Sequence, residues 1–270
     1  MTERIERAAE SAQRRAVAAQ EAVAERVGAA QDAAARGALN VREQAADMRE
    51  QAAEVVAKVK PRLRGVIHEY AFFAAIALGA LLVLRANGDR QVVATTIYAA
   101  GICGLFGISA LYHRVNWRRP RARAWMRRLD HSMIFVFIAA SFTPFALLVL
   151  HGSKGTTMLI VAWGLALAGV VMSLVWVGAP KWLTATVYVV LGMLGAVLAP
   201  EIWSGLGWLA FAGIAFGGAL YATGAVIYAT ERPNPAPSVF GYHEVFHTLV
   251  TGAAATHYAV IAFLLIPLTT

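Results

Sequence analysis

The residues with the clearest chemical potential are two histidines four positions apart, His243 and His247, in the stretch GYHEVFHTLV. In an α-helix, residues at i and i+4 lie on one face, about 40° apart around the axis, so both imidazoles can reach one ion. With Glu244 they form the pattern His-Glu-x-x-His, which in soluble proteins holds zinc. Here the pattern opens an apolar run long enough to cross a membrane, so a third ligand must come from another element.

A second pair with the same spacing, Ser109 and His113, ends an earlier apolar run in the stretch GISALYHR, and Asp130 begins the next run in RRLDHSMIF. Ionisable groups inside apolar spans are costly, so each is a candidate functional residue. Glu244 is the direct neighbour of His243 and points about 100° away from it on a helix. Asp130 therefore suits the role of a base better, and the role of Glu244 stays open.

The elements that must position these residues are membrane helices. The chain has 270 residues, of which 59% are hydrophobic and 15% charged, which is too apolar for an ordinary soluble domain. After residue 61 we find seven apolar runs, each near the roughly 20 residues that a bilayer-crossing helix needs. They cover residues 66–84, 92–112, 129–150, 157–178, 182–199, 206–229 and 244–268. The sequence predicts an all-α, seven-transmembrane helix bundle over residues 62–270.

The basic residues are concentrated in alternate linkers, which sets the orientation of such a bundle. If the N-terminus is cytoplasmic, 13 of the Lys and Arg residues near the spans lie inside and 3 lie outside. We therefore expect an N-in, C-out, multi-pass protein of the plasma membrane. In that topology His113, Asp130, His243 and His247 lie near the cytoplasmic leaflet on three helices, with Ser109 one turn deeper.

Three histidines with an open position for water are the composition of a catalytic zinc centre. We predict Zn²⁺ held by His113, His243 and His247, with Asp130 hydrogen-bonding or deprotonating the bound water.

The remaining histidines are expected to be ordinary. We interpret His68, His131 and His151 as residues at headgroup level or in hydrogen bonds. His257 lies about 15 Å further along its helix than His247, too far to share the ion, and is expected to be buried and hydrogen-bonded.

Residues 1–61 form a different region. They are rich in Ala, Gln, Glu and Arg, and hold 10 of the 16 acidic residues of the chain. This composition favours helix, but the sparse apolar positions keep no steady heptad. We expect a cytoplasmic, solvated and partly disordered helical tail; a surface-lying amphipathic helix or a weak coiled coil are the alternatives.

Four stretches resemble the hemolysin III family: RGVIHEYA, SALYHRVNW, RRLDHSMIFVFIAASFTPF and GYHEVFHTLVTGAAATHYAVI. The family is related to the progestin and adipoQ receptors and, more distantly, to the alkaline ceramidases. The resemblance covers about residues 62–268, and its combination of Ser-x3-His, Asp and His-x3-His is specific. It implies Zn²⁺ on His113, His243 and His247, with Asp130 on the bound water and Ser109 nearby. Glu244 is not shared by the adiponectin receptors.

The related ceramidases suggest metal-dependent hydrolysis of a lipid amide near the cytoplasmic leaflet, with Asp130 as the base and Ser109 helping to hold the oxyanion. Two alternatives stay open: a pore-forming or cytolytic protein, as the family name implies, and a non-catalytic sensor in which zinc is structural. An open fourth ligand position favours catalysis, and a fourth protein ligand favours structure. Expected partners are the lipid bilayer and a lipid substrate, with no nucleic acid.

Overall fold

The computed structural model describes residues 61–176 and 178–269, and every structural statement below concerns these residues. The helices are α2 (Val66–Leu84), α3 (Gly88–Arg114), α4 (Pro120–Leu148), α5 (Ser153–Val175), α6 (Lys181–Gly192), α7 (Leu194–Thr230) and α8 (Tyr242–Val260), which continues into a π-helix (Ile261–Leu265) and the short α9 (Ile266–Leu268). The predicted tail, residues 1–61, lies outside the described residues except for Pro61, so its structure stays a prediction.

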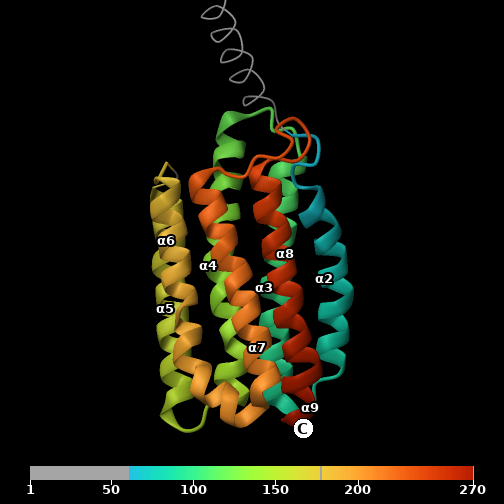
Figure 1. Ribbon diagram of the computed structural model, residues 1–270, viewed down its shortest axis with the longest axis vertical. Helices are drawn as coiled ribbons and strands as arrows, with labels where there is room; N and C mark the ends of the chain where they lie inside the picture. The colour runs from blue at the N-terminus through green and yellow to red at the C-terminus, as the bar shows by residue number, and fades with distance from the viewer. Residues whose placement is uncertain (1–60, 177, 270) are drawn as a thin grey trace, which may run out of the picture. The chain divides into compact units, whose positions relative to one another are not determined.

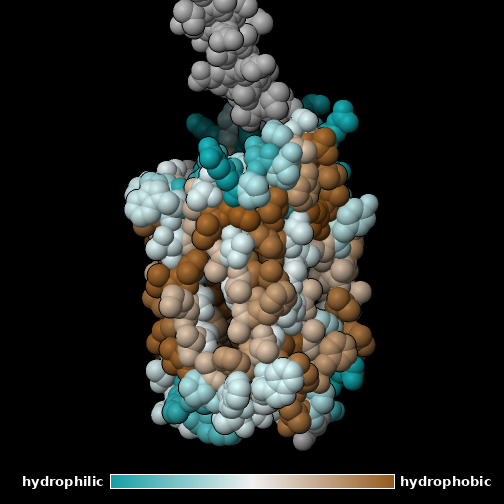
Figure 2. Space-filling view, in the orientation of Figure 1, coloured by the Kyte–Doolittle hydropathy of each residue, from teal (hydrophilic) through white to brown (hydrophobic). Residues whose placement is uncertain are grey.

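The described helices form a bundle in which they run side by side along a common direction (Figure 1). Within the described residues, six helical stretches are long and apolar enough to cross a membrane. In the space-filling view a hydrophobic belt surrounds the middle of the bundle and hydrophilic residues gather at its two ends (Figure 2). The predicted all-α membrane architecture is confirmed.

One of the six stretches accounts for two of the seven predicted runs. Residues 182–199 and 206–229 belong to a single stretch of 50 residues, Lys181–Thr230, and the predicted gap between them is helical. The backbone leaves helical geometry at Gly207, with φ 83° and ψ 175°, a conformation that glycine adopts at little cost. In Figure 1 the chain runs down the bundle through α6 and the first part of α7, and the rest of α7 runs back up.

Helix α4 begins earlier than the apolar pattern predicts. It starts at Pro120 rather than near residue 129, because proline fits the first position of a helix, where its missing N–H is not needed. The arginine-rich segment before Asp130 is therefore helical, not a linker. Asp130 lies about three turns inside α4 instead of at its start.

The start of α2 is joined to the loop between α7 and α8. The backbone N–H groups of Arg62 and Leu63 donate to the carbonyl oxygens of Ser238 and Val239, each at 3.1 Å. We call this pair of bonds the 62/238 clasp. It holds the first turn of α2 beside the first turn of α8, although the two segments are far apart in sequence.

The basic residues are distributed unequally between the two ends of the bundle. The end at which α2, α4, α6 and α8 begin holds eleven of the described Lys and Arg residues: Arg62, Arg64, Arg114, Arg118, Arg119, Arg121, Arg123, Arg127, Arg128, Lys181 and Arg232. The opposite end, where the C-terminus lies, holds Arg85, Arg90 and Lys154.

Candidate metal centre

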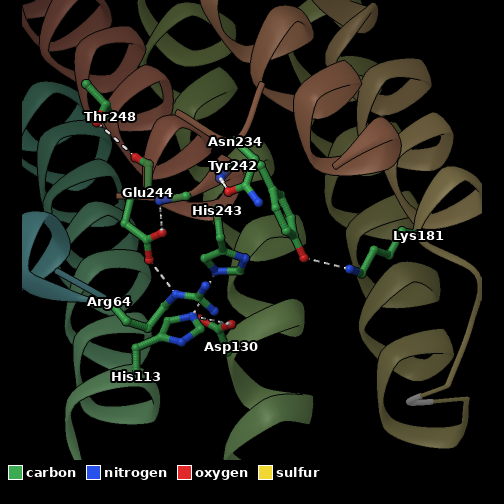
Figure 3. Close-up of polar contacts among 10 residues, drawn as sticks. Arg64, His113, Asp130, Lys181, Asn234, Tyr242, His243, Glu244 and Thr248 are labelled. Carbon is green, nitrogen blue, oxygen red and sulfur yellow. Dashed lines mark hydrogen bonds and ion pairs between the residues drawn. The ribbon is translucent and has the colours of Figure 1, made fainter. Parts of the chain in front are cut away.

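Three imidazoles converge at the basic end of the bundle. His113 lies in the last turn of α3, and His243 and His247 lie in the first two turns of α8. One nitrogen from each ring lies within 4.8 Å of the other two, and His113 Nε2 and His243 Nε2 are 3.1 Å apart. In Figure 3 the His113 and His243 side chains point toward each other, with Asp130 beside them. We call these residues the histidine triad.

The triad fits a small divalent cation. Zinc binds histidine nitrogens at about 2.1 Å with tetrahedral angles, which places two ligand nitrogens about 3.4 Å apart. The distance of 3.1 Å between His113 Nε2 and His243 Nε2 is close to this value. In addition, the Nδ1 atom of His247 is buried and has no hydrogen-bond partner among the described residues. Buried polar atoms are normally paired, so a bound ion would account for the arrangement.

Asp130 lies next to the triad and is not a member of it. Its Oδ2 atom is 3.7 Å from His113 Nε2, and its side chain is 12% exposed. Ser109, one turn before His113 on α3, is buried and lines the same cavity as Asp130. An acceptor and a hydroxyl therefore stand beside the three imidazoles, on the two neighbouring helices α3 and α4.

His68 is a fourth imidazole at this site, and the sequence interpretation missed its position. It is buried rather than at headgroup level, although it is hydrogen-bonded as expected: its Nδ1 atom lies 2.8 Å from Ser109 Oγ. Its ring stacks on His247 with centroids 3.7 Å apart and planes 5° apart. The signal was present, because His68 lies in the first turn of α2 and hence at the same end of the bundle as the triad.

Glu244 is not a member of the triad, and its carboxylate is held by other partners. One carboxylate oxygen accepts a hydrogen bond from the Gly241 backbone N–H at 2.8 Å, which caps the N-terminus of α8. The other pairs with Arg64, just before α2 (Figure 3). The Glu244 side chain is 1% exposed and that of Arg64 21%. A buried carboxylate needs such partners, and these two connect Glu244 to the start of α8 and to the segment before α2.

Gly65 brings the chain before α2 against His113. Its φ of 82° favours glycine, and a Cβ at this position would lie 2.6 Å from His113 Cβ. The contact sets how closely the start of α2, which carries His68, approaches the end of α3.

The other histidines are not members of the triad. His151 is exposed at the opposite end of the bundle. His131 is half-buried, and its backbone carbonyl accepts a hydrogen bond from the Tyr188 hydroxyl at 3.2 Å. His257 is half-buried and its Nε2 atom lies 3.2 Å from the Ile214 carbonyl oxygen, as expected for a hydrogen-bonded histidine.

A cavity of about 490 Å³ extends from the triad into the bundle. At the triad end its lining includes His68, Asp130 and the triad histidines His243 and His247, and further along it is mostly apolar residues of α4, α6, α7 and α8. Some lining residues of α6, the following segment and α7 are exposed: Gly192, Met193, Ala196, Ala215 and Gly218. Figure 2 shows a hollow in the hydrophobic belt on this side.

Comparisons with known proteins place the chain in a family. A family model described as Haemolysin-III related matches residues 56–258. The chain is 29% identical to the Hemolysin-3 homolog of Bacillus subtilis (strain 168) over 69% of this chain and 85% of that protein. It is 28% identical to Hemolysin-3 of Bacillus cereus, over 72% and 87%. It is 29% identical to the Heptahelical transmembrane protein ADIPOR2 of Oryza sativa subsp. japonica, over 63% and 80%. The chain belongs to the haemolysin-III related family of membrane proteins.

Proposed function

We propose that this chain binds Zn²⁺ through His113, His243 and His247 and hydrolyses an amide bond in a lipid. The observation that carries the proposal is the position of the triad at one end of a largely apolar cavity. Three neutral imidazoles are the ligand set of catalytic zinc sites that keep a position open. A mostly apolar cavity with a few polar groups at one end suits a molecule with a polar head and a long hydrocarbon chain.

The side chains around the triad supply the remaining chemistry. Zinc held by the triad would supply a Lewis acid at this end of the cavity. Asp130, whose Oδ2 atom lies 3.7 Å from His113 Nε2, would act as the general base for a water molecule at the site. The Ser109 hydroxyl donates a hydrogen bond to the developing oxyanion, and His68 orients that hydroxyl from 2.8 Å. Glu244 takes no part, because both of its oxygens are engaged elsewhere.

The hydrocarbon chain of the substrate enters from the bilayer. The exposed lining residues of α6 and α7 are small, apart from Met193, so little side-chain bulk separates the cavity from surrounding lipid on that side. The triad end receives the head of the lipid and the apolar lining receives its chain.

The proposed topology has seven crossings, with the triad on the cytoplasmic side. A straight helix of 50 residues would be about 75 Å long, more than twice the hydrocarbon thickness of a bilayer, whereas the turn at Gly207 divides Lys181–Thr230 into two spans. The printed name of the rice relative, a heptahelical protein, supports the same number. Eleven of the described basic residues lie at the triad end and three at the other, which favours a cytoplasmic triad. A reporter fused after Thr270 should be accessible from outside, and one fused before Met1 only from the cytoplasm; accessibility of both from one side would contradict this topology.

Metal analysis of the purified chain tests the ligands. Wild type should carry about one zinc per chain, and His247→Ala should lose most of it. The matched control is His151→Ala, which removes an exposed histidine at the other end and should leave zinc unchanged. Full zinc retention in variants of all three triad histidines would reject the site.

Turnover of ceramide-like amides tests the reaction. Asp130→Asn keeps the shape of the side chain but removes the base, so zinc content should stay near one per chain while turnover falls by about 10²–10⁴-fold. Lost zinc together with a lowered melting temperature would make Asp130 a ligand in a structural site. The printed name Hemolysin-3 motivates a parallel assay of dye release from vesicles; release by a protein that hydrolyses no amide would favour the cytolytic alternative.

A further inference from the structure

The middle of the cavity carries polar residues that the proposed reaction does not use. Of the described polar residues that line the cavity, most lie near the triad; His257, Tyr221 and Ser141 lie deeper. His257 is ten residues beyond His247 on α8, and Ser141 is eleven beyond Asp130 on α4, which places each about 15 Å from the triad end. Tyr221 is seven residues before Tyr228 on α7, about 10 Å deeper than that residue.

Tyr221 and His257 are in direct contact. Their ring centroids are 5.5 Å apart and their planes are inclined at 70°. The His257 ring packs closely against α7, since a Cβ on Gly217 would lie 2.4 Å from its Cδ2 and Nε2 atoms. His257 Nε2 bonds to the Ile214 carbonyl oxygen, which can only accept, so this nitrogen carries the proton and Nδ1 of the neutral ring is an acceptor.

The Tyr221 hydroxyl is the feature that points to a ligand. It is buried and has no hydrogen-bond partner among the described residues. The great majority of buried polar side-chain atoms have a partner, which can be a protein group, an ordered water or a bound molecule. Ser141 adds acceptor capacity to the same region, because its hydroxyl proton is donated to the Ile138 carbonyl oxygen and its lone pairs are left over.

We propose that Tyr221 and His257 form a polar subsite that binds a hydroxyl group in the middle of the lipid chain. The subsite gives the cavity a preference for mid-chain hydroxylated acyl groups over plain ones, with the Tyr221 hydroxyl donating to the ligand and His257 Nδ1 available to accept from it. This inference rests on the proposed function for the direction in which the lipid lies, with its head at the triad.

Binding of fatty acids to the purified full-length chain tests the subsite without any reaction. The probes are octadecanoic acid, its mid-chain hydroxy derivative, and the isomer with the hydroxyl beside the carboxyl group. Wild type should bind the mid-chain derivative about fivefold more tightly than the other two, the difference expected from one neutral hydrogen bond. Tyr221→Phe keeps the ring contact with His257 and should bind all three probes alike.

Tyr98→Phe is the matched control, since Tyr98 is a buried tyrosine whose hydroxyl donates to the Ala254 carbonyl oxygen and which does not line the cavity. It should keep the preference. Gly217→Ala should weaken the preference by displacing the His257 ring, whereas Gly164→Ala on α5, whose Cβ would meet nothing within 4 Å and which does not line the cavity, should not.

Equal affinity of wild type for all three probes would overturn the subsite and identify the buried hydroxyl as a water-binding position only, while the zinc hydrolase proposal would stand. Failure of all three probes to bind would overturn the subsite and the lipid cavity together, and zinc content would then decide whether the metal centre survives. A preference that Tyr221→Phe retains would also reject the assignment.

Discussion

Replacing Glu244 by glutamine separates a structural carboxylate from a reacting one. The amide side chain of the Glu244→Gln variant would keep an oxygen that can accept from the Gly241 N–H, so the cap of α8 should survive. What disappears is the negative charge opposite Arg64, which leaves a guanidinium that is 21% exposed without its partner. A hydrogen bond to a charged group contributes about 1.5–3 kcal/mol, so we expect a loss of about 2 kcal/mol.

Thermal unfolding of the purified protein measures this loss. For a chain of this size, about 2 kcal/mol corresponds to a decrease in melting temperature of about 4–8 °C. The matched control is Glu69→Gln at the same end of the bundle. Glu69 pairs with Arg114 at 2.7 Å, but the two side chains are 40% and 46% exposed, so the change should be below about 1 kcal/mol.

A double-mutant cycle removes the remaining ambiguity. In Arg64→Met combined with Glu244→Gln no unpaired charge is left, so the double variant should be about 1–2 kcal/mol more stable than the sum of the single losses predicts. The equivalent cycle on Glu69 and Arg114 should give a coupling energy below about 1 kcal/mol. A coupling energy near zero for the first pair would refute the structural role of Arg64 and Glu244.

The same variant distinguishes the two carboxylates as bases. Glu244→Gln should keep about one zinc per chain, and its turnover of lipid amides should fall by less than about tenfold, in contrast to the roughly 10²–10⁴-fold expected for a lost general base. An unchanged melting temperature with a hundredfold loss of turnover would assign the base to Glu244 instead of Asp130.

Three further predictions concern the surroundings of the triad. Gly65→Ala should lower the stability by about 1–2 kcal/mol because of its positive φ, and it should also weaken zinc binding because the new Cβ contacts His113. The control is Gly88→Ala, with φ 73° and nothing within 4 Å of the new Cβ, which should show the backbone strain alone. Equal zinc affinity in the two variants would refute the contact. His68→Phe should keep the stacking on the neighbouring imidazole and the zinc, yet lower turnover because the serine hydroxyl loses its partner; unchanged turnover would show that this hydrogen bond is not needed. Removal of zinc by a chelator should lower the melting temperature of wild type and leave that of His247→Ala unchanged. If zinc was present at about a thousand times its Kd, the decrease for wild type corresponds to about 4 kcal/mol. An equal decrease in both proteins would point to zinc bound elsewhere.

The sequence was sufficient for the parts of the fold that depend on local pattern. Apolar runs of membrane length predicted the helices, and the i,i+4 spacing predicted that His243 and His247 share a face, because both follow from helix geometry and the bilayer alone. The meeting of His113 with that pair could also be anticipated, since alternate helix ends lie at the same depth. The predicted depth of a residue in the membrane does not give its lateral position, so it could not show which helices are in contact.

The rest depends on packing between distant segments. The partnership of Arg64 and Glu244, the stacking of His68 on His247 and the cavity all arise from contacts across the bundle that no local pattern encodes. The position of the turn at Gly207 was missed for another reason. The linker was predicted near residue 200, where the composition is least apolar, whereas the turn requires a residue that tolerates positive φ.

The 62/238 clasp determines how a force on the chain before α2 is transmitted to the bundle. Residues 62 and 63 are bonded to residues 238 and 239, and Arg64 continues the connection to Glu244 in the first turn of α8. Tension applied to the chain at residue 61 is therefore delivered to the beginning of α8, one residue from His243, before it reaches α2. Whatever anchors or pulls the N-terminal region acts on the helix that carries two of the three histidines.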